Sequence, residues 1–131
     1  MLAIDTSALI KRYVDEPGRD KTVRLMETET TWSASLVVRT EAQIAFCRLF
    51  GDDETVTGVM SDLDRDLARF VLVPVDELCL ERAARIGCTA GVRTLDAIHL
   101  AAAERLPRPV RFLTFDHRQR EAAASLGFEV V

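Results

Sequence analysis

The segment Leu2-Ala3-Ile4-Asp5-Thr6-Ser7-Ala8-Leu9-Ile10-Lys11 shows in miniature how the chain is built: an apolar run, a polar turn, and then a helical stretch. This alternation recurs along the chain, which predicts an α/β fold whose strands are joined by crossover helices into a parallel sheet. The five predicted strands, mostly too apolar to be half-exposed, are residues 2–4, 31–34, 70–73, 111–115 and 128–131.

Longer stretches with helical periodicity separate these strands, and we expect them to cover both faces of the sheet. The predicted helices are residues 7–14, 19–27, 36–50, 53–69, 76–89, 95–105 and 117–126. The turn Glu16-Pro17-Gly18 separates the first two helices, and Pro107 and Pro109 end the sixth.

Length and composition indicate one folded domain over residues 1–131. The chain is 48% hydrophobic and 29% charged, and its 131 residues leave little room for a second core. No apolar run approaches the ~20 residues that cross a bilayer, and the start lacks the basic and apolar zones of a signal peptide. We therefore expect a cytoplasmic protein without a membrane partner.

The net charge and the cysteines exclude other classes of protein. A net charge of −4 argues against a basic DNA-binding domain, whereas an acidic protein can act on RNA when metal ions neutralise its carboxylates. Cys47, Cys79 and Cys88 are odd in number, form no CxxC pair and lie in apolar helical contexts. We expect all three to be reduced residues of the core.

Two aspartates follow predicted strands that we expect to be central neighbours. Asp5 comes after the first strand and Asp116 after the fourth. Ligands of open parallel sheets bind beyond the carboxyl ends of strands, where the strand order reverses. Each aspartate has a structural alternative: Asp5 caps the next helix, and Asp116, with Gln119 three residues later, forms a variant of the capping box.

Two further acids lie on predicted helices. Glu41 has apolar neighbours one turn away on both sides, so it is either buried with a partner or turned outward to water, Arg39 or Arg48. Asp96 lies in the first turn of the sixth helix, after the candidate N-cap Thr94, where the helix dipole alone favours a carboxylate.

One edge of the predicted sheet thus gathers four acids: Asp5, Glu41, Asp96 and Asp116. Two carboxylates about 4 Å apart repel by about 4 kcal/mol at an effective dielectric near 20, so a fold that gathers them normally does so around a cation. Oxygen ligands without a thiolate or histidine set indicate Mg²⁺ or Mn²⁺.

The histidines and aromatic residues show no ligand pattern. His99 and His117 lie on different predicted helices and form no metal motif. His99 is one turn after Asp96, within reach of the acids, but we expect a satisfied or partly buried side chain. Trp32 and the scattered phenylalanines are expected to pack in the core or at strand edges rather than to stack on bases.

These motifs closely resemble the PIN-domain family, in particular the VapC ribonuclease toxins of type II toxin–antitoxin systems. The resemblance is carried by Asp5-Thr6-Ser7-Ala8-Leu9-Ile10-Lys11 with Glu16-Pro17-Gly18, by Val38-Arg39-Thr40-Glu41, by Arg93-Thr94-Leu95-Asp96-Ala97-Ile98-His99-Leu100, and by Leu113-Thr114-Phe115-Asp116 with Leu126-Gly127-Phe128. Each motif alone is weak, whereas four in the family's order and spacing, spanning essentially the whole chain, are fairly specific.

The resemblance implies a three-layer α/β/α sandwich with a five-stranded parallel sheet. It also implies endonucleolytic hydrolysis of RNA by a water bound to Mg²⁺ or Mn²⁺, with the four acids as catalytic metal ligands. Ser7 and Thr114 would orient ligands or water. Arg93 would steady a phosphate, unless it is only a solvated charge beside its helix.

The resemblance further implies partners for the chain. These are a second copy of the chain in a homodimer, the RNA substrate, and a small VapB-like antitoxin whose tail fills the toxin groove. DNA is reached only through the other end of the antitoxin. We expect partner contacts on the first four helices, which carry the most exposed apolar variation.

Three other classes of protein compete with this hypothesis. A receiver-type phosphoacceptor domain would use Asp76 and Thr114. It also requires a lysine after the fifth strand and an acidic pair after the first, whereas this chain lacks the lysine and has a lone Asp5. A phosphatase with a nucleophilic aspartate wants a second Asp at the place of Ser7. A catalytically silent interaction module, whose acids only cap helices, would show no tight response to metal.

Overall fold

Five parallel strands form the centre of the computed structural model, which describes residues 1–131. They are β1 (Leu2–Ile4), β2 (Trp32–Ser35), β3 (Val71–Val73), β4 (Arg111–Leu113) and β5 (Glu129–Val130). Their order is β3-β2-β1-β4-β5, and every neighbouring pair is parallel. The predicted five-stranded parallel sheet is therefore confirmed.

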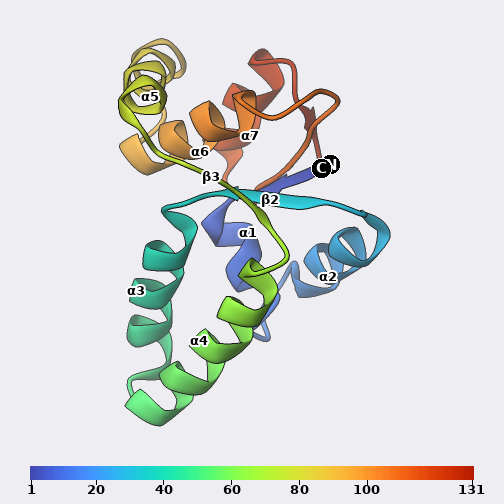
Figure 1. Ribbon diagram of the computed structural model, residues 1–131, viewed down its shortest axis with the longest axis vertical. Coiled ribbons are helices and arrows are strands. Elements are labelled where there is room, and N and C mark those ends of the chain that lie inside the picture. Colours follow the sequence, from blue (N-terminus) through green and yellow to red (C-terminus); the bar gives the residue numbers. More distant parts are fainter.

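Seven helices cover the two faces of the sheet and complete the predicted α/β/α sandwich (Figure 1). They are α1 (Thr6–Ile10), α2 (Arg19–Thr28), α3 (Val38–Phe50), α4 (Asp53–Leu67), α5 (Glu77–Ala90), α6 (Thr94–Glu104) and α7 (His117–Ser125). Helices α1 to α4 lie on one face and α5 to α7 on the other, and α3 and α4 project together away from the sheet.

The period-two alternation of β1 divides the core into two clusters. Leu2 and Ile4 belong to the cluster on the side of α1 to α4, whereas Ala3 belongs to the cluster on the side of α5 to α7. Both faces of this central strand are thus buried, which explains why its sequence is apolar throughout.

The pairing of β1 with β4 places the candidate site. Ile4 is in register with Leu113, and the Asp5 amide donates a hydrogen bond to the Leu113 carbonyl at 3.1 Å. Asp5 and Thr114 are therefore neighbours just beyond the carboxyl ends of two central strands. Here the chain also switches from one side of β1 to the other, as the sequence predicted.

Several boundaries differ from the sequence prediction. The first helix ends at Ile10 rather than at Val14, and the chain continues to Tyr13 in turns. The fourth strand ends at Leu113 because the Thr114 side chain turns to local partners. The expectation of buried strands is wrong for β3, where Val71 is 44% exposed, because β3 lies at the edge of the sheet.

The prediction that all three cysteines belong to the core is wrong for two of them. Cys79 is buried, but Cys47 and Cys88 are exposed. The buried residues of α3 follow a four-residue spacing through Val38, Ala42 and Phe46, and Cys47 lies one position beyond this stripe.

Among the aromatic residues, Trp32 packs as predicted and Phe115 does not. Trp32 is 9% exposed, and its indole Nε1 donates to the Met26 carbonyl at 2.7 Å. Phe115 lies just beyond β4 and is 36% exposed.

Exposed apolar side chains are spread more widely than the sequence suggested. The large ones are Leu36, Ile44, Leu49, Val71, Leu78, Leu80, Leu95 and Phe115. Of the first four helices only α3 carries any, and α5 carries two, because the apolar stripes of α1, α2 and α4 are turned into the core. None of the helices combines the length and hydropathy needed to span a bilayer.

Candidate functional site

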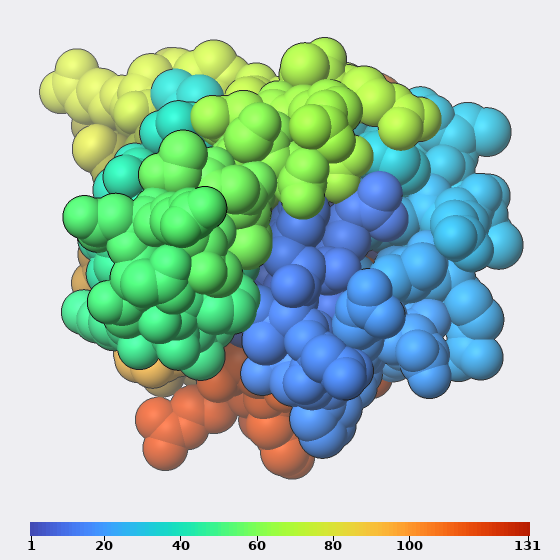
Figure 2. All heavy atoms as spheres, turned by 90° about the horizontal axis from the view of Figure 1, so that it is seen from below, coloured from blue at the N-terminus to red at the C-terminus, as the bar shows by residue number.

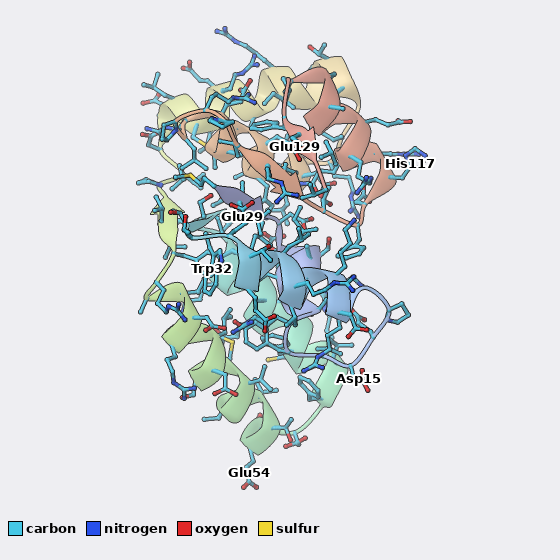
Figure 3. The ribbon with its side chains drawn as sticks, turned by 90° about the vertical axis from the view of Figure 1, so that its right-hand side faces the viewer. Asp15, Glu29, Trp32, Glu54, His117 and Glu129 are labelled. Atoms are coloured by element: carbon cyan, nitrogen blue, oxygen red, sulfur yellow. The ribbon has the colours of Figure 1, made fainter.

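A hollow of about 350 Å³ lies at the carboxyl edge of β1 and β4. Its lining residues are Asp5, Ser7, Ile10, Lys11, Glu16, Arg93, Asp96, Phe115 and Asp116. In Figure 3, His117, which begins α7 at this edge, lies on the opposite side of the molecule from Trp32 and Glu29 at the amino edge. The hollow therefore brings together three of the four predicted acids, but not Glu41.

Asp5 is the most deeply buried acid of the set, at 3% exposed. Its Oδ1 accepts a hydrogen bond from the Ala8 amide at 2.9 Å, so it is the N-cap of α1. Its Oδ2 accepts from Ser7 Oγ at 2.8 Å and from Thr114 Oγ1 at 3.1 Å. The carboxylate is thus held in one orientation by three donors, and both predicted supporting hydroxyls touch it.

The pKa of Asp5 is raised above its usual value. Burial is the main cause, and it outweighs the nearby His99 and the hydrogen bonds from Ala8, Ser7 and Thr114, which act in the opposite direction. No lysine or arginine forms an ion pair with Asp5. A buried carboxyl without a cationic partner is a group that gains from binding a cation.

Asp116 caps α7, as the alternative interpretation of the sequence proposed. Its Oδ1 accepts from the Gln119 amide at 2.8 Å. The reciprocal half of the capping box is rerouted, because Thr114 Oγ1 accepts from the Asp116 amide at 3.1 Å and lies 2.6 Å from Gln119 Oε1. The single proton of the Thr114 hydroxyl is shared between Gln119 Oε1 and Asp5 Oδ2. Sequence analysis missed this role of Gln119, which is fully buried.

Asp96 lies in the first turn of α6, and the exposed Arg93 reaches both it and Asp116. Arg93 Nε donates to Asp96 Oδ2 at 3.0 Å, and its Nη2 lies 3.8 Å from Asp116 Oδ2. Arg93 rather than Thr94 is the N-cap residue of α6. A flexible cation, 78% exposed at its side chain, thus stands at two of the acids.

Glu41 turns inward, not toward Arg39 or Arg48. Its Oε1 lies 2.6 Å from Nε2 of the buried His99 and accepts from Thr6 Oγ1 at 2.8 Å. Thr6 Oγ1 and His99 Nε2 are themselves 3.1 Å apart. All these contacts converge on Oε1, which leaves Oε2 without a hydrogen bond.

The contacts of Glu41 keep it ionised. Burial alone would raise the pKa of Glu41, but the hydrogen bond and charge of His99 and the Thr6 hydroxyl outweigh it, so the pKa lies below its usual value. His99 Nδ1 is the one buried side-chain nitrogen or oxygen without a hydrogen-bond partner. His99 is therefore buried but only half satisfied. Neither it nor Thr6 was assigned to the site from sequence, although His99 lies one turn after Asp96.

The donor set at the hollow fits Mg²⁺ or Mn²⁺. Asp5, Asp96 and Asp116 offer only carboxylate oxygens, the ligands that these ions prefer. As the side chains stand, no three carboxylate, imidazole or thiolate groups are gathered closely enough to hold a metal ion. A cation bound here would require the carboxylates to move closer together than they stand.

A larger hollow, of about 540 Å³, lies elsewhere. It is lined by Arg12, Met26, Glu27, Thr28, Glu29, Thr30, Trp32 and Arg69. It contains none of the predicted site residues, and Arg12, its link to α1, already pairs with Asp66 at 2.6 Å. The larger volume alone therefore does not identify this hollow as the functional site.

Two of the rival classes lose support from the geometry. The receiver hypothesis needs Asp76 near Thr114, but two strands, β2 and β1, lie between β3 and β4, and Asp76 forms a bidentate pair with Arg105 at 2.9 Å. The silent-module hypothesis is correct that Asp5 and Asp116 cap helices. It does not explain why both caps, with Asp96, line the same hollow.

Comparison with known proteins gives a consistent picture. The model of the PIN domain family matches residues 2–125. Ribonuclease VapC46 of Mycobacterium tuberculosis (strain ATCC 25618 / H37Rv) is 36% identical over 129 residues, covering 98% of this chain and 94% of the relative. Ribonuclease VapC47 of Mycobacterium tuberculosis (strain CDC 1551 / Oshkosh) is 29% identical over 135 residues, covering 98% and 93%.

Two solved structures share the fold. FitAcB from Neisseria gonorrhoeae matches with a TM-score of 0.76 at 18% identity, covering 99% of this chain and 96% of the other. A toxin–antitoxin complex from Klebsiella pneumoniae matches with a TM-score of 0.71 at 20% identity, covering 99% and 94%. With a family model that spans nearly the whole chain and a relative more than 30% identical, this protein belongs to the PIN-domain family.

Proposed function

We propose that the protein is a metal-dependent endoribonuclease that acts as the toxin of a VapBC-type toxin–antitoxin pair. The observation that carries this proposal is the hollow beyond the carboxyl ends of β1 and β4 that is lined by Asp5, Asp96 and Asp116. The relatives named ribonuclease VapC support RNA as the substrate.

Asp5, Asp96 and Asp116 would hold Mg²⁺ or Mn²⁺, with Glu41 contributing directly or through water. A bound divalent ion would supply an acidified water for attack on phosphorus and a positive charge for the transition state. The ordered residues of the chain do the positioning: Ser7 and Thr114 fix the Asp5 carboxylate, and His99 with Thr6 fixes Glu41.

Arg93 has a second task in this proposal. When Asp96 and Asp116 turn to a cation, the guanidinium loses its partners and is free at the rim of the hollow. A guanidinium binds two phosphate oxygens through paired N–H groups, so Arg93 is suited to hold the RNA phosphate.

The decisive experiment is cleavage of a mixed RNA pool by antitoxin-free protein with Mg²⁺, Mn²⁺ or EDTA. We expect cleavage with metal, loss of cleavage in Asp5→Asn and Asp96→Asn, and normal cleavage in Asp62→Asn. Asp62 is a matched control because it is an exposed aspartate on α4 that is also paired with an arginine. Thermal unfolding with and without metal shows whether each variant is folded and binds the ion.

The silent-module alternative predicts a different pattern. In that case no RNA is cut under any metal, and Mn²⁺ leaves the unfolding temperature of the wild-type chain unchanged. Metal stabilisation without cleavage would instead indicate a narrow RNA substrate that the pool does not contain.

The proposed partners are a small VapB-like antitoxin and a second copy of the chain. An antitoxin that places a basic side chain at the acidic hollow would take the position that Arg93 holds in the free chain. The exposed apolar residues on α3 and α5 support a homodimer. If the chain is a cytoplasmic toxin, its expression alone should arrest growth, and co-expression with a VapB-like antitoxin should relieve the arrest. Sedimentation of the purified toxin measures its oligomeric state.

A further inference from the structure

Phe115 occupies an unusual place for an aromatic residue. It lies between Thr114 and Asp116, lines the acidic hollow, and is 36% exposed. It also lines a second hollow of about 390 Å³ whose other lining residues are His117, Arg120, Glu121, Ala124 and Val130. Phe115 thus borders both hollows.

Both lysines of the chain lie over the Phe115 ring. The Lys11 Nζ is 4.8 Å from the ring centroid and the Lys21 Nζ is 5.8 Å from it. Lys11 also pairs with Glu16 at 3.0 Å, whereas Lys21 has no ion-pair partner. Figure 2 shows the red-orange start of α7 against the blue segment that follows α1. Two cationic side chains from separate segments thus meet at one exposed ring.

The backbone holds the ring in place at Gly18. A Cβ at this position would lie 2.6 Å from Phe115 Cε1, and Gly18 has a φ of 99°, where side chains are strained. The glycine that begins α2 thus allows the edge of the ring to lie directly against the main chain. The ring is a fixed surface, whereas the lysine side chains around it are flexible.

We infer that Phe115, Lys11 and Lys21 form a nucleotide-binding subsite beside the acidic hollow. The base next to the bond that is cut stacks on Phe115, and the lysines bind the flanking phosphate. This inference rests on the proposed ribonuclease function and adds to it a position where single-stranded RNA is held. It also revises the expectation that no phenylalanine of this chain stacks on bases.

The relative strengths of the two contacts favour the replacement of a lysine on the Phe115 ring by a base. A base stacked on an aromatic side chain changes affinity by about 5- to 150-fold, which is more than a lysine over an exposed aromatic ring contributes. A base can therefore displace an ammonium group from the ring. The released ammonium is then within reach of the phosphate that the base brings with it, so both groups gain.

The test uses the uncleaving Asp96→Asn chain with Mg²⁺ and a fluorescent single-stranded RNA of about ten nucleotides that contains 2-aminopurine. Anisotropy gives the affinity, and 2-aminopurine fluorescence reports stacking. We expect Phe115→Leu, which keeps an apolar contact with Gly18, to weaken binding by about 5- to 150-fold, the factor that corresponds to the loss of one stacked base. Phe115→Trp should retain both signals.

Lys21→Gln tests the phosphate contact. It should reduce the slope of log affinity against log salt by about 0.7, the value for one phosphate of a single strand. Arg85→Gln is the matched control, because Arg85 is an exposed cation without an ion pair on α5, on the other face of the sheet. It should leave the slope unchanged.

Equal affinity and equal 2-aminopurine signals in Phe115→Leu and in the parent would overturn the subsite, while cleavage by the wild-type chain would leave the nuclease intact. If Phe115→Leu binds RNA normally but escapes the antitoxin, the surface contacts protein and the inference is also wrong. If the wild-type chain neither cuts nor binds RNA, the proposed function fails first, and the subsite with it.

Discussion

Nε2 of His99 lies 2.6 Å from Oε1 of Glu41 and thereby joins α6 to α3 through two polar groups within an apolar region. Replacing His99 by Phe would leave the partly buried Glu41 with the Thr6 hydroxyl as its only donor. We expect the free energy of unfolding at neutral pH to fall by about 1–3 kcal/mol, as for other buried groups that lose a partner. His99→Gln, whose amide can donate at a similar position, should recover part of it in urea denaturation.

Asp5→Asn should stabilise the metal-free protein at neutral pH. The folded-state pKa of Asp5 is raised by burial, so ionisation favours the unfolded chain, and wild-type stability decreases as the pH rises through the ordinary aspartate value of 3.8 toward the raised one. The Asn variant lacks this loss. The difference in unfolding temperature between variant and wild type, measured in EDTA, should therefore grow as the pH rises above the ordinary aspartate value.

Asp52→Asn is the control for this prediction, because Asp52 is also an N-cap aspartate. Its pKa is lowered by the hydrogen bonds from Thr55, so its ionised form favours the folded chain. As the pH rises, the unfolding temperature of Asp52→Asn should therefore fall relative to that of the wild type. If the unfolding temperatures of both variants change in the same direction relative to the wild type, the burial of Asp5 does not cause the pH dependence.

Arg93→Ala should bind Mn²⁺ a few-fold more tightly than the wild type in the absence of RNA. The guanidinium is a competing cation for Asp96 and Asp116, and an exposed ion pair of this kind has a modest strength. The same variant should have a higher KM for RNA. Calorimetric titration with Mn²⁺ and steady-state cleavage measure the two effects, and a weaker affinity for Mn²⁺ would rule out the role of Arg93 as a counter-ion.

Asp66 and Asp64 offer a matched test of burial in ion pairs on one helix. Asp66 Oδ2 accepts from Tyr13 at 2.7 Å and from Arg12 at 2.6 Å, with 15% of its side chain exposed. Asp64 pairs with Arg39 but is 46% exposed. Asp66→Ala should lower the free energy of unfolding by about 1.5–3 kcal/mol, and Asp64→Ala by less than about 1 kcal/mol, as measured by urea denaturation.

The sequence was sufficient for those parts of the site that depend on strand order. Asp5 and Asp116 follow strands whose apolar composition marks them as central, and the parallel sheet then brings their ends together. Asp96 was placed at this edge because it lies in the first turn of a helix that follows it. Local periodicity and the rules for parallel sheets are enough for these three positions.

The remaining features depend on contacts that local patterns do not encode. Glu41 and His99 are 58 positions apart, and only the packing that brings α3 beside α1 and α6 decides that the glutamate turns inward. The exposure of Cys47 follows from the exact rotation of α3, which a periodic pattern fixes only to within about one residue. Phe115 is an apolar residue, yet it is 36% exposed beyond the end of β4, and its ring lies against the backbone of Gly18, nearly a hundred positions earlier.

Helix α6 has seven consecutive buried residues, 97–103, four of them alanines that let it lie close to the sheet. Asp96 lies at the start of this buried run, whereas Arg93 and Lys21 have long side chains at the rim of the hollow. Substitutions at the rim can alter which RNA is held without moving the acids. Substitutions in the buried run of α6 would move Asp96 as well. We therefore expect RNA preference to diversify among relatives of this chain faster than their chemistry.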